Sequence, residues 1–383
     1  MVILRLQRFM VFKGIATDAL DTAMKPITVP PIYCPLPVMQ HPAIAAVEQP
    51  CREWLRRWGL FPSQVQRERL DAMGVGRLCG MIYPYGPQHT LQIATDYIMW
   101  AFAYDDELCD EGPASENPSL LIEASSRIQR ILESPEVAID PLDRYGMALL
   151  DIRRRLLAVG EEKQATRFTT LMRTYFMAEM WKSVSAQPSL SDYMPQRLMG
   201  GGGMTFPFFC HAVPQLDLDE SELADRRIAA LTEMAAMFAL WDNDIFSWPK
   251  EAFRPQNKKG HNLIEVIGRE YRCSVEEALV IAVDMRERVQ GLYLRLYEHM
   301  FSQASPQMHQ YLLGLNAYIS GVLQWHRTTP RFRFINGVEG AECLLGGELA
   351  CTPRSLGFEA LPIASLAWWW QYDPAAKERW SES

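Results

Sequence analysis

The amino-acid sequence predicts an all-α protein built as a single large helical bundle. Apolar residues recur at spacings of three and four over most of the 383 residues, which is the pattern of helices with one buried face. Short alternating segments joined by hairpin turns, which would predict a sheet, do not recur. No linker divides the middle of the chain, so the helical series from about residue 40 to 330 favours one bundle over two domains.

The helical pattern is clearest in seven segments. In chain order they are 88–104, 119–134, 142–159, 164–186, 222–246, 275–300 and 306–326. Ser274 and Glu277 form a capping box ahead of the sixth segment, which continues for about seven turns. Four glycines at 200–203 predict a break in the chain of helices, because glycine costs a helix about 1 kcal/mol relative to alanine.

The two ends of the chain differ from this bundle. We expect residues 1–23 to form an unstructured extension, 24–335 to form the folded domain and 336–383 to form an irregular tail. The tail carries three consecutive tryptophans, Trp368 to Trp370. They either cover an apolar groove or a partner, or belong to a loosely attached segment, and the sequence leaves both interpretations open.

Composition and charge exclude several classes of protein. With 38 basic and 46 acidic side chains the net charge is −8, which argues against non-specific binding to nucleic acid. No apolar run approaches the roughly 20 residues that span a bilayer. The 8 cysteines have no zinc-site spacing and are typical of reduced, buried thiols. We therefore expect a cytoplasmic protein without a membrane span, either a monomer or a homodimer.

An acidic cluster follows the first of these helices. The segment DDELCDE occupies 105–111, and no lysine or arginine occurs between Arg77 and Arg127. Each carboxylate at a helix C-terminus costs about 0.3–1 kcal/mol, and an ordinary solvated face would mix charges of both signs. An EF-hand is excluded because its obligatory glycine position is Asp110. The cluster favours a cation site over an exposed acidic loop.

A second set of oxygen donors lies in the segment WDNDIFSWPKE. Asn243, Ser247 and Glu251 follow one another at i, i+4 and i+8, so their directions spread over only about 80° of a helix. Amide, hydroxyl and carboxylate oxygens are ligands that Mg²⁺ prefers, although such triplets also arise by chance. The segment is a candidate for a second metal-binding face.

Two oxygen-rich clusters, each short of six ligands, indicate a shared ligand that completes the coordination. Mg²⁺ characteristically fills its shell with waters and phosphate oxygens. The sequence therefore indicates a phosphorylated or diphosphorylated small molecule. Arg197, Lys250 and Arg331 are the basic residues that could bind it.

These motifs resemble those of the class I terpene cyclases of microbial type. The run at 105–111 resembles the aspartate-rich motif of that family, and 243–251 is similar to its Asn/Ser/Glu motif. Arg197 lies 46 residues before Asn243, as the diphosphate-sensing arginine of the family does. Trp325 and His326 followed by Arg331 and Phe332 look like its terminal element, and PPIYCPLP at 30–37 with His41 and Pro42 looks like its opening segment.

The resemblance implies a fold and an activity. The fold is the class I terpenoid synthase bundle around a central apolar cavity. The activity is that of a lyase that ionises a linear isoprenyl diphosphate and cyclises the carbocation, with three Mg²⁺ ions bound. Farnesyl diphosphate, giving a sesquiterpene, is the favoured substrate, and geranylgeranyl diphosphate, giving a diterpene, is the alternative. A prenyl diphosphate synthase and a non-catalytic helical cation-binding protein are weaker alternatives.

The resemblance also assigns roles to individual residues. Metal ligands would be Asp105, Asp110, Asn243, Ser247 and Glu251, and diphosphate ligands would be Arg197, Lys250 and Arg331. Asp106 would pair with Arg331, and Gly201 would lie at a helix break with a carbonyl group directed at the substrate. Phe102 and Trp325 would face the carbocation, although core packing is the common role of a single aromatic residue.

Two positions depart from the family pattern. Phe332 stands where tyrosine is usual, so a hydroxyl contact to diphosphate is absent. Gly200 stands where an acidic side chain often links the sensing arginine to the helix break. The sequence leaves open how this chain couples Arg197 to Gly201.

Overall fold

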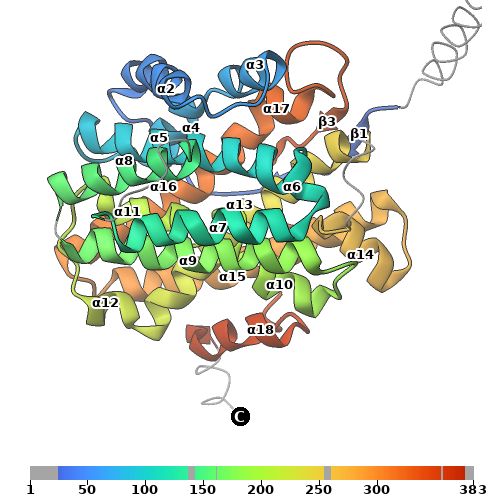
Figure 1. The fold of residues 1–383 in the computed structure, drawn as a ribbon. Coiled ribbons are helices and arrows are strands. Elements are labelled where there is room, and N and C mark those ends of the chain that lie inside the picture. The colour runs from blue at the N-terminus through green and yellow to red at the C-terminus, as the bar shows by residue number, and fades with distance from the viewer. Residues whose placement is uncertain (1–24, 137–142, 161, 254–259, 355–356, 376–383) are drawn as a thin grey trace, which may run out of the picture.

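The computed structural model of the protein describes residues 25–136, 143–160, 162–253, 260–354 and 357–375. Over these ranges the chain forms one bundle of packed helices (Figure 1), which confirms the all-α prediction. The expected extension at 1–23 lies outside the described residues. None of the helices in these ranges is long and apolar enough to cross a membrane.

Helices make up most of the described chain. Those ahead of the glycine-rich break are α2 (Ile44–Trp58), α3 (Gln64–Ala72), α4 (Val75–Ile82), α5 (Gln88–Tyr104), η2 (Asp105–Asp110), α6 (Pro113–Glu116), α7 (Pro118–Glu133), α8 (Arg144–Val159), α9 (Glu162–Val184) and α10 (Leu190–Met199). Those after it are α11 (Thr205–Ala212), α12 (Glu220–Ala224), α13 (Arg226–Ala252), α14 (Leu263–Tyr271), α15 (Val275–Phe301), α16 (Pro306–Thr328), α17 (Pro330–Arg333), α18 (Ala364–Ala367) and η3 (Trp368–Tyr372).

The seven predicted segments all correspond to helices. The capping box is present, since the Ser274 hydroxyl accepts a hydrogen bond from the Glu277 backbone N–H and the Glu277 carboxylate accepts one from the Ser274 backbone N–H. The fifth segment begins four residues late because Asp225 caps α13 and separates it from α12. The break at 200–203 is also present between α10 and α11, and Gly201 and Gly202 adopt positive φ angles of 56° and 81°.

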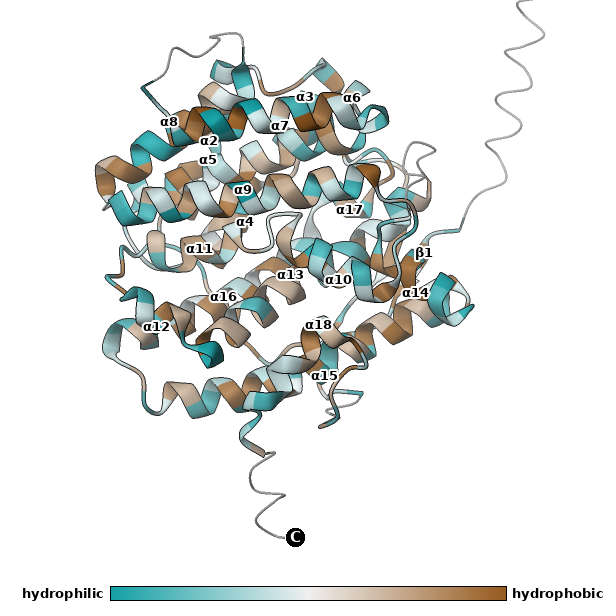
Figure 2. Ribbon diagram, turned by 60° about the horizontal axis from the view of Figure 1, so that its bottom comes forward, coloured by the Kyte–Doolittle hydropathy of each residue, from teal (hydrophilic) through white to brown (hydrophobic). Residues whose placement is uncertain are grey.

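A stack of aromatic rings fixes the direction of α5. Trp100 packs nearly parallel to Tyr97 at 6.3 Å and to Tyr104 at 4.8 Å between ring centroids, and all three side chains are fully buried. Such contacts contribute about 0.5–1.5 kcal/mol each beyond burial. The outer helices carry hydrophilic and hydrophobic residues side by side, as amphipathic helices do (Figure 2). The core therefore holds the C-terminal end of α5, where the acidic cluster begins.

The bundle also has two pairs of very short strands at its edges, although the sequence made a sheet unlikely. β1 (Ile27–Val29) pairs in parallel with β3 (Leu344–Gly346), and β2 (Ile32–Tyr33) pairs in parallel with β4 (Leu349–Ala350). Strands of two or three residues are too short to show alternation in the sequence, and their partners lie at the opposite end of the chain. The pairs attach the segment after α17 to the segment before α2.

The C-terminal tryptophans pack onto the bundle. They lie in η3, directly after α18, so the described part of the predicted irregular tail includes regular structure. Trp369 is fully buried and donates its indole N–H to Glu233 at 2.9 Å. Asp373 forms an ion pair with Arg295 at 2.7 Å. The α18 segment lies at the end of the bundle away from α2 and α3 (Figure 1). The tryptophans thus cover the bundle's own apolar surface.

Candidate active site

One cavity collects nearly every residue that the sequence singled out. It has an empty volume of about 1320 Å³, counting its open mouth, and lies between η2, α9, α10, α13, α16 and α17. Its lining includes Phe102, Asp105, Asp110, Arg197, Gly201, Asn243, Ser247, Lys250, Glu251, Trp325 and Arg331. Asp106 lies behind this lining, against Arg331. Asp105 and Arg331, which are 226 positions apart in the chain, therefore line the same cavity.

The acidic cluster begins where α5 widens into the π-helix η2. The i→i+5 hydrogen bond from Glu111 N–H to the Asp106 carbonyl, 2.9 Å long, marks this wider winding. In an α-helix, residues five apart point about 140° from each other, and the wider winding of a π-helix makes this angle smaller. Asp105 and Asp110 consequently both face the cavity.

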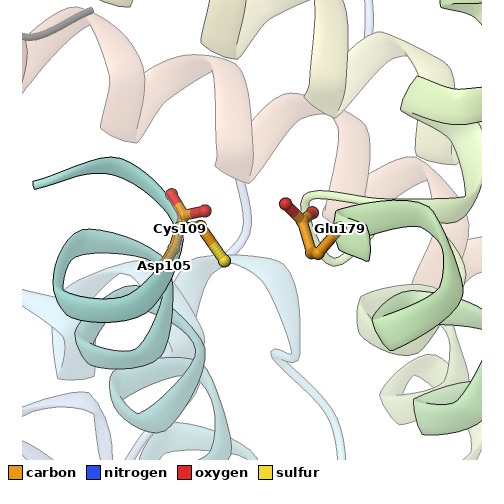
Figure 3. A group of neighbouring side chains, drawn as sticks. All are labelled: Asp105, Cys109 and Glu179. Atoms are coloured by element: carbon orange, nitrogen blue, oxygen red, sulfur yellow. The ribbon is translucent and has the colours of Figure 1, made fainter. Parts of the chain in front are cut away.

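Asp105, Cys109 and Glu179 form a compact group of potential metal ligands. One ligand atom from each lies within 4.8 Å of the others, and Glu179 approaches from α9 across the gap from η2 (Figure 3). Burial raises the pKa of the Cys109 thiol well above its usual value, so the sulfur stays protonated and is a poor ligand for a hard cation. The oxygen atoms of Asp105 and Glu179 are the useful donors of this group.

The charge balance of this group fits a bound cation. Burial and the neighbouring Asp110 raise the pKa of Asp105 well above its usual value. Lys182 approaches from α9 and lies 3.1 Å from Asp110 and 3.8 Å from Glu179. In this cluster one positive charge, the ammonium group of Lys182, thus lies beside the carboxylates of Asp105, Asp110 and Glu179. A divalent cation bound here would balance the remaining negative charge.

Asp106 and Arg331 form a buried, bidentate ion pair. The two guanidinium nitrogens donate to the Asp106 oxygens at 2.6 and 3.0 Å, and Gln66 donates to the same carboxylate at 2.6 Å. Although burial opposes it, the charge and hydrogen bonds of Arg331 lower the pKa of Asp106 to about 2. Asp106 is therefore committed to holding Arg331 at the edge of the cavity, as the resemblance implied.

The predicted second ligand set lies on the last turns of α13. Asn243, Ser247 and Glu251 all line the cavity, so the helical spacing places them on one face. Arg197 reaches this face from α10 and donates to Asn243 at 3.1 Å and to Asp244 at 2.6 Å. The guanidinium therefore contacts the first residue of the triplet directly.

Gly201 lies against Arg197 at the break between α10 and α11. A Cβ atom at this glycine would overlap the Arg197 guanidinium, and the positive φ angle of 56° also favours glycine. The Gly201 N–H donates to the Glu179 carboxylate at 2.9 Å. A Cβ atom at Gly200 would lie 2.9 Å from the same carboxylate oxygen, so Glu179 occupies the space of the absent side chain.

Glu179 and Lys182 were missed by the sequence analysis. Glu179 lies on the core-facing side of α9 and is only 2% exposed, in a helix whose other buried residues are mostly apolar. A single carboxylate on an apolar face was the available signal, because buried charges are rare unless they are paired. Lys182, one turn further along α9, belongs to the same cluster.

Aromatic side chains also line the cavity, close to its charged residues: the centroid of the Phe102 ring lies 5.0 Å from the guanidinium carbon of Arg331. The rings of Phe102 and Trp325 lie 5.5 Å apart, and the Trp325 indole N–H donates to the Met73 carbonyl at 2.8 Å. With that N–H bonded, the ring presents an apolar face beside Phe102. Phe206 and Tyr318, which are not among the predicted site residues, also line the cavity.

Phe332 lies in the cavity wall at the position where the related motif has tyrosine. Its side chain is 1% exposed, packs edge-on against Trp325 and lies 5.5 Å from the Lys250 ammonium nitrogen. We expect Phe332→Tyr to be tolerated, because the ring keeps its packing and the hydroxyl adds a polar group near Lys250. Melting temperature and turnover measured against the parent test this, and a collapse of activity would mean that the Arg331 region is misassigned.

The chain matches known proteins over most of its length. The sequence model for "Terpene synthase family 2, C-terminal metal binding" matches residues 96–290, which hold the 105–111 and 243–251 segments. The chain is 33% identical over 346 residues to (+)-(1(10)E,4E,6S,7R)-germacradien-6-ol synthase of Streptomyces pratensis, covering 89% of this chain and 96% of that protein.

Two further matches agree with this one. A (+)-T-muurolol synthase of Streptomyces clavuligerus, named as cyclising (2E,6E)-farnesyl diphosphate, is 30% identical over 350 residues, with 88% of this chain and 81% of that protein covered. The crystal structure of the SVS_A2 protein from ancestral sequence reconstruction superimposes with a TM-score of 0.78 at 29% identity, over 90% of this chain and 98% of that one. The chain therefore belongs to the class I terpene synthases of microbial type, within terpene synthase family 2, and is a terpene cyclase.

Proposed function

We propose that the chain is a Mg²⁺-dependent cyclase that ionises farnesyl diphosphate and closes the resulting carbocation into a sesquiterpene, releasing diphosphate. One observation carries the proposal: oxygen donors from η2 and from α13 line the same cavity as three basic residues and an aromatic wall. A substrate with a charged head and a hydrocarbon tail is complementary to a cavity lined by both charged and aromatic side chains.

The metal ligands of this proposal are side chains on two elements. On η2, Asp105 and Asp110 would hold cations, and on α13 Asn243, Ser247 and Glu251 would hold another. All five offer oxygen, which suits Mg²⁺ better than softer metals. When bound, Mg²⁺ would neutralise the negative charge that develops on the leaving diphosphate, a stabilisation specific to the transition state.

The basic residues would bind the diphosphate directly. Arg197, Lys250 and Arg331 line the cavity and can donate hydrogen bonds to its oxygens. Asp106 keeps Arg331 oriented through its bidentate pair. Gly201 lies against the Arg197 guanidinium. A shift of the arginine toward the diphosphate would therefore move the backbone at the break between α10 and α11.

The apolar part of the cavity would control the carbocation. Phe102 and Trp325 both line the cavity, and a ring whose face lies against the carbocation would stabilise it by about 0.5–2 kcal/mol. The aromatic and aliphatic side chains of the lining would keep water from the cation until cyclisation is complete. We propose that residues 24–335 form the catalytic domain and that the strand pairs with 344–350 attach the remainder to it.

Farnesyl diphosphate is the favoured substrate because a similar protein, the T-muurolol synthase, is named for cyclising it. Geranylgeranyl diphosphate, which would give a diterpene, is the alternative. A prenyl diphosphate synthase would need a second aspartate-rich motif, where this chain has Asn243, Ser247 and Glu251.

We expect incubation with Mg²⁺ and farnesyl diphosphate to release inorganic diphosphate and to give a cyclic hydrocarbon or alcohol detectable by gas chromatography. Geranyl and geranylgeranyl diphosphate, tested in parallel, establish the preferred chain length. Isothermal titration with Mg²⁺ and inorganic diphosphate provides a second measurement, in which a cyclase binds the two cooperatively. No turnover of any of the three substrates by folded protein would contradict catalysis.

A further inference from the structure

Asn262 is a buried residue between α13 and α14 that also lines the cavity. It directly precedes α14 and is 7% exposed. Its side-chain oxygen accepts a hydrogen bond from the Ile264 N–H at 2.9 Å, which makes it the N-cap of α14. This bond accounts for the oxygen atom of the carboxamide and leaves its nitrogen atom to be explained.

The surroundings of Asn262 determine which way its amide group points. A backbone N–H can only donate, so the atom that faces Ile264 must be the oxygen. The atom on the other side faces the Asp244 carbonyl and the Glu251 carboxylate, which can only accept, so it must be the nitrogen. Both arguments give the same orientation.

The amide nitrogen bridges two of the proposed metal ligands. It lies 3.0 Å from Oε2 of Glu251, 3.4 Å from Oγ of Ser247 and 3.0 Å from the Asp244 carbonyl oxygen. The bond to Glu251 restrains the glutamate side chain, which is long and would otherwise rotate freely. A carboxylate bonded through one oxygen retains its other oxygen for a cation.

We propose that Asn262 is a positioning residue for the metal site on α13: its amide orients Glu251 and Ser247 before the cation binds. The inference rests on the proposed metal role of those two residues. The N-cap of α14 sets where the amide stands, so the start of one helix determines the ligand geometry at the end of another. Pre-organised ligands bind a cation more tightly because less side-chain freedom is lost on binding.

A purely structural role for Asn262 makes a different prediction. Serine, aspartate and asparagine are about equally good N-caps, and a cap needs only the side-chain oxygen. Replacing Asn262 by serine therefore keeps the cap of α14 and removes the amide nitrogen. If capping were the only role, Asn262→Ser would leave the metal requirement unchanged.

We expect Asn262→Ser to raise the Mg²⁺ concentration that gives half-maximal turnover by about tenfold, the effect of having to order one flexible side chain when the cation binds. Turnover at saturating Mg²⁺ should stay close to the parent value, because Asn262 does not contact the reacting atoms in this scheme. Calorimetric titration of Mg²⁺ into protein with inorganic diphosphate should show the same weakening. Asn262→Gly loses the capping bond as well, but glycine is tolerated at N-cap positions, so this variant should show the same weakening of Mg²⁺ binding.

The matched control is Asn117→Ser. Asn117 caps α7 through the same kind of bond, to the Ser119 N–H at 3.2 Å, and it is not among the residues that line the cavity. This control should leave the Mg²⁺ requirement unchanged. An unchanged requirement in both Asn262 variants would overturn the inference, whereas a parent enzyme whose turnover does not depend on a divalent cation would overturn the proposed function itself.

Discussion

Glu251→Gln is expected to reduce turnover by about a hundred- to a thousandfold while the protein stays folded. The substitution keeps the size of the side chain and an oxygen acceptor for the Asn262 amide, but it removes the negative charge that would hold the cation. The loss corresponds to removing one pre-organised group that stabilises charge in the transition state. Diphosphate release and product formation at several Mg²⁺ concentrations measure it. Asn243→Ala should have a similar effect.

The same substitution at a distant site is the control for Glu251→Gln. Glu123 lies on α7 in an exposed pair with Arg127, with side chains 62% and 61% accessible. Glu123→Gln should leave turnover unchanged, since exposed pairs contribute little and this one is not part of the cavity lining. If Glu251→Gln or Asn243→Ala retained full activity with an unchanged melting temperature, the assignment of metal ligands to α13 would be wrong.

Arg286→Met is expected to lower the free energy of unfolding by about 3–5 kcal/mol, which is the cost of leaving a buried charge without its partner. Arg286 and Asp242 are fully buried, and the guanidinium donates to the carboxylate at 2.5 and 3.0 Å. Arg286 also donates to the Tyr33 carbonyl at 3.0 Å and so holds the N-terminal segment. Denaturant unfolding measures the change.

A double variant separates the lost ion pair from lost packing. Adding Asp242→Leu to Arg286→Met removes the unpaired carboxylate, so part of the stability should return. Because Asp242 precedes Asn243 on α13, a loss of activity in Arg286→Met that is reversed in the double variant would show that this pair also supports the site. A loss below about 1 kcal/mol in the single variant would contradict the strength assigned to the pair.

The helices could be predicted because their signal is local. Apolar spacing, the Ser274 capping box and the glycine-rich break at 200–203 are properties of adjacent residues, and each appears in the structure as expected. The strand pairs could not be predicted in this way. Ile27 pairs with Leu344, and segments of two or three residues carry no periodicity of their own.

The candidate site was predictable to the extent that its residues form motifs. The acidic run and the Asn/Ser/Glu triplet were identified from spacing, and the cavity contains residues of both. Glu179 and Asn262 were not identified, because each acts through contacts with residues of another element: Glu179 with the Gly201 N–H and Asn262 with Glu251. Neither contact leaves a repeated pattern in the sequence.

The sequence by itself determined the helical class of this protein, the two oxygen-rich segments and the charged residues that a diphosphate would need. Only the tertiary structure decided that these segments share a cavity, that the π-helical turn directs both Asp105 and Asp110 into it, and that Glu179 takes the place beside Gly200. The physical reason is how far apart in the sequence the interacting residues lie. Periodicity and capping arise from neighbours within a few residues, whereas the convergence of η2, α9 and α13 depends on how whole helices pack.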